Sequence, residues 1–325
     1  MNILVLGGSG LFGRKIVIHL LRDGDVSSVV SMDVNSPSDW FYKSISKSTQ
    51  KFNFVRGDVS QLEDILNVIK LHGVDRIVNM AFILTGAFEL NPRLAIKVDT
   101  LGACNVFEAA RIMGISRVVY ASSVAVYGPQ IEYGDRPVNE DDHLHPVNAY
   151  GLTKQLSEIL AERYSELFGI RSTGIRPFLG YGHGGVFPPI IKLFSDLISL
   201  PAVGKQFSVD TDGRDKAALS SADDVAALVK NLIKSPSSPH PVYNIASPPT
   251  SMREIDETVR KYVPGAIINF GKESAQGDPR QGLPGRASMA KAKEDFGFSV
   301  LPLEEAVLSH INDARLDAGL DLIEK

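Results

Sequence analysis

The chain has 325 residues, of which 44% are hydrophobic and 22% are charged, so we expect a sizeable core and exclude a disordered protein. Its formal net charge of −4 argues against binding to nucleic acid or to an anionic membrane through bulk charge. The single cysteine excludes an internal disulfide and a multi-cysteine metal site. With no signal-peptide pattern and no apolar run near ~18 residues, we expect a soluble, cytoplasmic protein without a metal.

Short apolar runs alternate with longer helical patterns along the chain. The predicted strands are Ile3–Leu6, Val29–Asp33, Phe52–Arg56, Arg76–Met80, Arg117–Ala121, Ser172–Arg176 and Val242–Ala246. The predicted helices lie near residues 12–23, 60–71, 92–113 and 150–168. This alternation indicates βαβ units, and continuously apolar strands indicate a sheet covered on both faces. We therefore predict an α/β fold with a doubly wound parallel sheet.

The amino-acid composition of the sequence changes after residue 176. Glycine, proline and polar residues become frequent in the segments 180–189, 235–241 and 264–288, which indicates loops and a less regular second lobe. The length also suggests about two domains. We predict a dinucleotide-binding domain of residues 1–176 plus 218–248, and a smaller, C-terminal-biased substrate-binding lobe of residues 177–217 plus 249–325.

Two predicted helices, 92–113 and 150–168, are too apolar for helices with one buried face. The first carries Leu94, Ile96, Val98, Leu101, Val106, Phe107, Ile112 and Met113, and the second carries Leu152, Leu156, Ile159, Leu160, Leu167 and Phe168. A helix without a broad polar face is buried on more than one side. Either the rest of the chain covers these helices or they form a subunit interface.

The string GGSGLFGR follows the first predicted strand and opens a helix. Gly7, Gly10 and Gly13 suit a φ > 0 corner, a close approach of backbone N–H groups to a pyrophosphate, and tight packing of helix on strand. The helix N-terminus offers free N–H donors and the positive end of its dipole to phosphates. The pattern predicts a dinucleotide site in a Rossmann-type sheet; the alternative is a tight turn without a ligand.

Asp33 lies 20 residues after Gly13, at the end of the second predicted strand. An acidic residue at this distance bonds the adenosine ribose hydroxyls and repels a 2′-phosphate. No Arg or Lys follows Asp33 within five residues, so we predict NAD(H) rather than NADP(H). Arg14 argues in the other direction, and a carboxylate that merely starts a turn is the alternative for Asp33.

Tyr150 and Lys154 are spaced i, i+4 at the start of a predicted helix, so both side chains lie on one face. A nearby ammonium favours the phenolate and is expected to lower the pKa of the tyrosine. Ser123 follows the strand that ends at Ala121, at the sheet edge where open α/β sheets bind ligands. The three groups thus have a common meeting point; otherwise they are an ordinary surface pair and a helix cap.

Together with GGSGLFGR, the segments YASSVAVYG at 120–128 and YGLTK at 150–154 resemble an extended short-chain dehydrogenase/reductase of the NAD-dependent epimerase/dehydratase family. The resemblance extends to 57–59, 79–81, 98–102, ADDVA at 222–226 and DPR at 278–280. Asp99 stands where this family usually has Asn. The resemblance implies NAD as cofactor and a homodimer through helices 92–113 and 150–168.

The resemblance also implies roles by position. Tyr150 would be the general acid/base, Lys154 would bond the nicotinamide ribose and lower the pKa of the phenol, and Ser123 would hold the reacting oxygen. The implied cofactor contacts are Gly7, Gly10, Leu11, Phe12, Gly13, Asp33, Asp58, Val59, Met80, Ala81, Tyr150, Lys154, Arg176 and Pro177. The implied substrate contacts are Phe82, Ser123, Leu179, Arg214 and Arg280.

The substrate class is left open by conflicting features. Arg214 and Arg280 resemble the residues that clamp the diphosphate in sugar-nucleotide relatives. Leu179 stands where such relatives commonly have Asn, and the apolar stretch 82–84 suits a less polar substrate. We predict NAD-dependent hydride transfer at a secondary alcohol or ketone, of the nucleotide-sugar epimerase type. The alternatives are a net NAD-dependent dehydrogenase or reductase of a non-nucleotide alcohol or ketone, and a non-catalytic NAD-binding protein.

Overall fold

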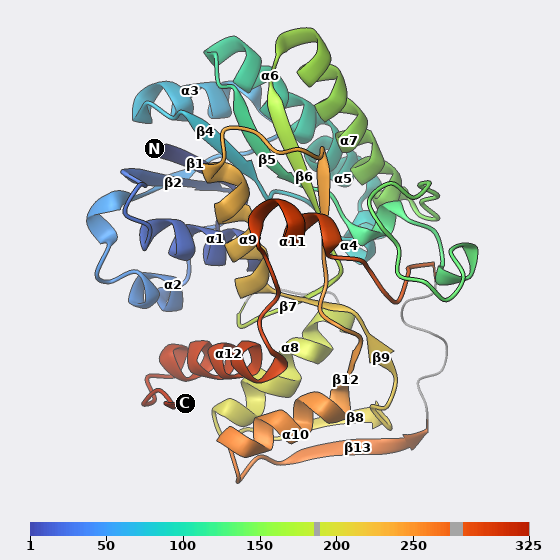
Figure 1. Cartoon of the computed structure of the whole chain (residues 1–325). Helices are drawn as coiled ribbons and strands as arrows, with labels where there is room; N and C mark the ends of the chain where they lie inside the picture. Colours follow the sequence, from blue (N-terminus) through green and yellow to red (C-terminus); the bar gives the residue numbers. More distant parts are fainter. Residues whose placement is uncertain (185–188, 274–281, 325) are drawn as a thin grey trace.

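Seven parallel strands form the central sheet of the computed structural model, which describes residues 1–184, 189–273 and 282–324. They are β1 (Asn2–Leu6), β2 (Ser28–Asp33), β3 (Phe52–Arg56), β4 (Arg76–Asn79), β5 (Arg117–Ala121), β6 (Arg171–Pro177) and β11 (Val242–Ile245). Their order in the sheet is β11-β6-β5-β4-β1-β2-β3 (Figure 1), so the chain reverses its direction of travel between β1 and β4. The predicted doubly wound, Rossmann-type sheet is therefore confirmed.

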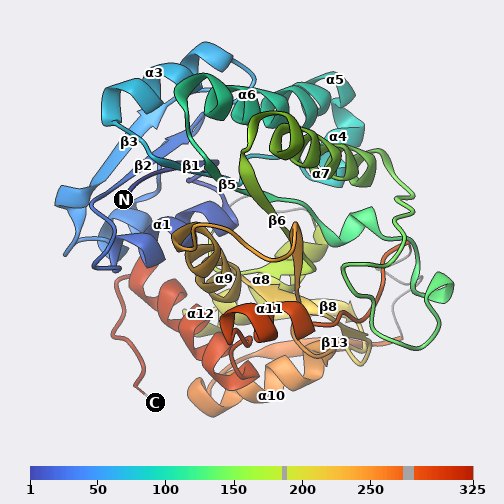
Figure 2. The ribbon, with the colours of Figure 1, turned by 45° about the horizontal axis from the view of Figure 1, so that its top comes forward.

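Helices cover both faces of this sheet (Figure 2). One face carries α3 (Leu62–His72), α6 (Ala103–Met113) and α7 (Ala149–Phe168), and the other carries α1 (Leu11–Leu21) and α9 (Ala222–Lys234). Side chains alternate along a strand, so Ile3 and Val5 enter the core under α1 while Leu4 and Leu6 enter the core under α3 and α6. Burial on both faces explains why these strands are continuously apolar.

The predicted helix 92–113 is broken into three segments. After α4 (Thr85–Leu90) come α5 (Pro92–Ala95), a π-helical segment (Ile96–Gly102) and α6. A Cβ at Gly102 would lie 2.8 Å from Cγ2 of Val59, so the helix passes very close to the loop after β3. A π turn holds one extra residue and is frequent at functional sites. Here it turns Asp99 into the interior, where its carboxylate is buried.

The second lobe lies below the sheet in Figure 1. It contains α8 (Pro189–Ala202), β8 (Phe207–Thr211), α10 (Met252–Tyr262), β13 (Ile268–Glu273) and α12 (Leu303–Asp317). The parallel pair β8–β13 and the three helices share one core, in which Leu197, Ile255 and Val307 are fully buried. This lobe therefore has a hydrophobic centre of its own.

Several short helices and strands complete the two parts of the chain. They are α2 (Asp39–Ser44), β7 (Leu179–Tyr181), β9 (Lys216–Ala217), β10 (Leu219–Ser221), β12 (Thr250–Ser251) and α11 (Ala290–Phe296). A buried ion pair joins the two parts of the chain, because Nζ of Lys15 on α1 lies 2.5 Å from Asp313 on α12. The same Nζ lies 3.0 Å from Asp223 on α9. Within the described ranges, no helix has the length and apolar character needed to cross a membrane.

Truncating a buried leucine of α9 should test the packing under the sheet. Leu228 is fully buried between α1, α9 and the strands, so Leu228→Ala is expected to lower the free energy of unfolding by about 2–5 kcal/mol. The matched control is Leu71→Ala on α3, because Leu71 is 78% exposed and its truncation should change stability by less than about 0.5 kcal/mol. Urea unfolding measures both, and equal effects would contradict this packing.

Candidate active site

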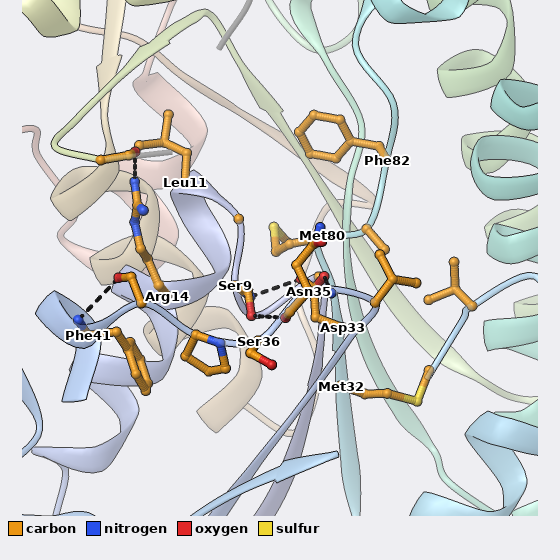
Figure 3. A pocket seen from close by; sticks show the side chains of 18 of the residues that line it. Ser9, Leu11, Arg14, Met32, Asp33, Asn35, Ser36, Phe41, Met80 and Phe82 are labelled. Carbon is orange, nitrogen blue, oxygen red and sulfur yellow. Dashed lines mark hydrogen bonds between the residues drawn. The ribbon is translucent and has the colours of Figure 1, made fainter. Parts of the chain in front are cut away.

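A cavity of about 740 Å³ opens at the carboxyl ends of β1, β2 and β4, where the strand order reverses (Figure 3). This volume lies in the range of sites that hold small molecules and cofactors. The lining residues are Gly7, Ser9, Gly10, Leu11, Arg14, Met32, Asp33, Val34, Asn35, Ser36, Pro37, Ser38, Trp40, Phe41, Gly57, Asp58, Val59, Met80, Ala81, Phe82, Ile83, Leu94, Val98, His183, Gly184 and Asp317.

The glycine-rich turn packs against the sheet without room for side chains. Gly7 has φ +71°, and a Cβ there would lie 2.6 Å from the carbonyl oxygen of Met80 at the end of β4. A Cβ at Gly13 would lie 2.1 Å from the carbonyl oxygen of Gly7, which seats α1 directly on the turn. Gly8, which the sequence did not single out, is equally constrained, since its Cβ would lie 2.1 Å from Oγ of Ser31.

Gly10 lines the cavity and differs from these glycines because a Cβ there has more room. It is the N-cap of α1, makes no side-chain cap, and a Cβ there would meet only the carbonyl oxygen of Gly7, at 3.2 Å. The first N–H groups of α1 therefore point at the cavity without a capping side chain. A free helix N-terminus with its positive dipole end is a binding site for phosphate.

Asp33 ends β2 with its carboxylate fixed by two backbone donors. The N–H of Ser9 and the N–H of Asn35 each donate to this carboxylate at 3.0 Å (Figure 3). A carboxylate oxygen accepts more than one hydrogen bond, so Asp33 keeps acceptor capacity for ligand hydroxyls. A phosphate-binding helix end and a carboxylate that accepts from hydroxyls suit a dinucleotide with a free ribose diol, so the residues present fit NAD.

Arg14 lines the same cavity but is bound to the second lobe. Its Nη2 donates to the carbonyl oxygens of His183 and Gly184, and its guanidinium lies 5.1 Å from the ring centroid of Trp40. Burial lowers the pKa of Arg14 to about 10. The guanidinium is thus held by carbonyl oxygens and an aromatic ring on the side of the cavity away from Asp33.

Tyr150, Ser123 and Lys154 come together beside the cavity. The side chain of Asn148 caps α7 by accepting from the N–H of Gly151 at 2.8 Å, and Tyr150 stands in this first turn. A Cβ at Gly151 would lie 2.2 Å from the carbonyl oxygen of Ala125, so α7 closely approaches the turn that follows β5. The side chain of Ser123 lowers the pKa of Tyr150, in opposition to burial, and Nζ of Lys154 lies 5.4 Å from the ring centroid of Tyr150.

The sequence predicted a lowered pKa for Tyr150, and this prediction is wrong when only the groups of the protein itself act on the phenol. Burial raises the pKa of Tyr150 well above its ordinary value, and the negative charge of Asp99 raises it further. Burial also lowers the pKa of Lys154, against the opposing effect of Asp99. Desolvation outweighs the ammonium because both groups are almost fully removed from water.

Phe82 stands between the cavity and this pair. Its ring lines the cavity, while its centroid lies 4.4 Å from Nζ of Lys154 and 6.3 Å from the ring centroid of Tyr150. Tyr150, Lys154 and Ser123 are not themselves part of the cavity lining. A ligand that extends from the cavity to the phenol therefore passes the Phe82 ring.

Several predicted contacts lie elsewhere. The guanidinium of Arg176 does not face the cavity, because it forms an ion pair with Glu158 at 2.7 Å and donates to the hydroxyl of Tyr127 at 2.7 Å. Phe12 packs into the core, where it meets Gly180. Pro177 and Leu179 belong to β6 and β7 and do not line the cavity; Arg214 is exposed on the surface, and Arg280 lies outside the described residues.

Some lining residues are not among the predicted site residues. Asn35, Ser36, Pro37 and Ser38 follow β2 directly, so a polar loop after the acidic residue pointed to them. Trp40 and His183 reach the cavity through α2 and the segment after β7, and Asp317 reaches it from the end of α12. Only tertiary packing brings these last residues to the site. No group of three or more potential metal ligands occurs in the part of the chain that the structure describes.

The comparisons of this chain with known proteins agree on one family. Residues 3–246 match the model of the NAD dependent epimerase/dehydratase family. The chain is 30% identical to an uncharacterized protein of Methanocaldococcus jannaschii, over 81% of each chain. It is 28% identical to a UDP-glucose 4-epimerase of Mycolicibacterium smegmatis, over 66% of this chain and 68% of that one. It is 25% identical to the solved L-threonine dehydrogenase of Phytophthora infestans, with a TM-score of 0.78 over 98% of this chain and 100% of that one.

Substituting Gly10 should separate cofactor binding from folding. Gly10→Ala places a methyl group where the phosphates would approach α1, yet the protein offers it only one tight contact, so we expect a folded protein whose NAD dissociation constant rises at least about 10-fold. Gly24→Ala is the matched control, because a Cβ at Gly24 meets nothing within 4 Å. Calorimetric titration with NAD measures both variants, and unchanged affinity in Gly10→Ala would contradict this site.

Proposed function

The chain belongs to the NAD-dependent epimerase/dehydratase family, and from this premise we propose that it is an epimerase that inverts a secondary alcohol of a nucleotide sugar. The observation that carries the proposal is the burial of Tyr150 beside Lys154 and Ser123, next to the cavity. A phenol, a hydroxyl and an ammonium in one dry site are the groups needed to move a proton at a carbinol oxygen. A protein that only binds NAD has no need of all three.

The glycine-rich turn and the strand ends would hold the cofactor. In this proposal the N-terminus of α1, with Gly10 and Leu11, binds the diphosphate, and Asp33 accepts from the adenosine ribose hydroxyls. Asp58 and Val59 line the side of the cavity for the adenine, and Met80 and Ala81 line the floor. NAD, when bound, supplies the acceptance and return of a hydride.

In this proposal, side chains of the protein transfer the proton. As the phenolate, Tyr150 takes the proton of the substrate hydroxyl at its oxygen, and Ser123 would hold the same substrate oxygen by a hydrogen bond. Lys154 stabilises the phenolate by its charge and bonds the nicotinamide ribose. In an epimerase the ketone then turns over in the site and regains the hydride on its other face while Tyr150 returns the proton to its oxygen, so no cofactor is consumed.

The second lobe would supply the substrate contacts, which makes residues 177–217 plus 249–325 the substrate-binding lobe of this proposal. Arg214 lies on an exposed turn of that lobe next to Asp212, whose side chain accepts from the N–H of Arg214 at 3.0 Å. A guanidinium there is available to bind a diphosphate. In this proposal the protein is cytoplasmic, which its single cysteine supports.

A net NAD-dependent dehydrogenase of a small alcohol is the second candidate. Phe82, Ile83 and Leu94 line the cavity near the phenol, and Leu179 lies where an amide would bond a diphosphate-sugar. Such walls suit a compact, less polar substrate. The similar L-threonine dehydrogenase of Phytophthora infestans, by its name, oxidises a small amino alcohol.

We also propose a homodimer. The helices α5 to α7 expose a continuous set of large apolar side chains, namely Leu94, Ile96, Leu101, Ile112, Leu152, Leu156, Ile159, Leu167 and Phe168. The chain itself does not cover these side chains, although both helices were expected to be buried on more than one side. An apolar face of this extent marks an interaction surface. Two copies joined through it would form a four-helix interface.

Turnover with substoichiometric NAD should decide between the two candidates. With UDP-glucose and a small amount of NAD, we expect the 4-epimer to accumulate well beyond the amount of NAD present, measured by chromatography of the nucleotide sugars. Tyr150→Phe should lower kcat by at least about 100-fold and leave NAD affinity nearly unchanged, because it removes only the titrating hydroxyl. NADH formed in step with product would instead support the dehydrogenase, and full activity in Tyr150→Phe would refute the mechanism.

A charge on the apolar face should break the dimer. Leu152 is 54% exposed on α7, so Leu152→Asp is expected to fold and to halve the molar mass measured by light scattering at micromolar concentration. Leu71→Asp is the control, since Leu71 is exposed on α3 outside the proposed face. A wild-type protein of monomer mass would contradict the proposed interface.

A further inference from the structure

Asp99 is a buried carboxylate that the mechanism above does not use. Its side chain belongs to a residue only 1% exposed, in the π-helical segment that interrupts the helix after β4. Oδ1 accepts from the N–H of Ile83 at 2.7 Å. Oδ2 is buried and has no hydrogen-bond partner among the described residues. A half-satisfied buried carboxylate costs stability, so its presence calls for a reason.

Lys154 is the matching cation. It is 3% exposed, and its ammonium has no hydrogen-bond acceptor or ion pair within 4 Å in the described part of the chain. Its near neighbour is the face of the Phe82 ring. Asp99 is the charged group whose field acts on Lys154, and Lys154 is the charged group whose field acts on Asp99. Each is therefore the counter-ion of the other across the site.

We propose that Asp99 is a positioning residue, which acts through its charge to keep Lys154 an ammonium beside Tyr150 and thereby sets the pH range in which Tyr150 exchanges its proton. This inference rests on the proposed role of Tyr150 as the acid/base. Asp99 acts through Lys154 and the phenol and is not itself a catalytic residue. It replaces the usual neutral amide of the family by a charge.

Few groups of the described residues face Asp99, Lys154 and Tyr150, so the direction in which Asp99 shifts the pKa of the other two is clear. Tyr150 and Lys154 come from α7, Ser123 comes from the end of β5, and Phe82 and the N–H of Ile83 come from the segment after β4. In the described residues, Asp99 and Lys154 are the charged members. The carboxylate raises the pKa of both Tyr150 and Lys154, because each loses a proton less readily next to a negative charge.

Asp99→Asn is the isosteric test. The amide oxygen can still accept from the N–H of Ile83, so the variant removes the charge and leaves the local hydrogen bond. Both limbs of the pH profile of kcat/KM are expected to move to lower pH, by about one unit, because the lost negative charge no longer raises the pKa of Tyr150 or of Lys154. Glu108→Gln on α6 is the control, because its carboxylate pairs with Arg111 and does not act on Lys154. Its profile should coincide with that of the wild type.

A second measurement needs no substrate. Calorimetric titration with NAD⁺ in two buffers of different ionisation enthalpy gives the number of protons released on binding, and the pH of greatest release is expected to fall by the same amount in Asp99→Asn. The unfolding temperature of the variant at neutral pH should equal or exceed that of the wild type, since a buried amide costs less than a buried carboxylate.

The outcomes separate the two proposals. If no nucleotide sugar is turned over but proton release shifts in Asp99→Asn, the proposed function fails and the role of Asp99 stands. If the limbs of the profile and the proton release are both unchanged, Asp99 has no electrostatic role and the inference is overturned. A variant with a lower unfolding temperature and an unshifted proton release would show a purely structural residue, which also overturns it.

Discussion

The close contact between the β1–α1 turn and the end of β4 is the constraint on which the rest of the site depends. Neither Gly7 nor Gly13 has room for a Cβ, so backbone meets backbone at the switch point of the sheet. This contact sets the N-terminus of α1 at one wall of the cavity and the segment Met80–Phe82 at the other. Because Phe82 also contacts Lys154, the position of Tyr150 and Lys154 relative to the cavity follows from the same turn.

Burial and charge then act in opposite directions on the pair. Removing Tyr150 and Lys154 from water disfavours the phenolate and the ammonium alike, and Asp99 strengthens the first effect while it opposes the second. A proton acceptor in this site thus depends on positive charge brought close to the phenol.

The sequence predicted the sheet well because its signals are local. The strands at 52–56 and 117–121 have the predicted bounds, and the glycine spacing located the turn. The helix at 92–113 was predicted as unbroken because the π turn depends on the contact of Gly102 with Val59, which periodicity does not contain. The family resemblance implied a cofactor contact for Arg176, but its guanidinium pairs with Glu158, which α7 brings from another part of the chain. Long-range charge pairing of this kind leaves no local pattern.

The C-terminal helix shows how far this long-range organisation extends. Asp317 lines the cavity from the end of α12 and lies 3.0 Å from the His183 ring, while Asp313 on the same helix pairs with Lys15 of α1. Arg14, the neighbour of Lys15, holds the carbonyl oxygens of His183 and Gly184. The cofactor-binding helix is thus tied to the second lobe on two successive residues. Residues of both parts complete the cavity, so a ligand that binds there also stabilises the contact between the two parts. Binding in this cavity is therefore linked to the position of the lobe that is proposed to hold the substrate.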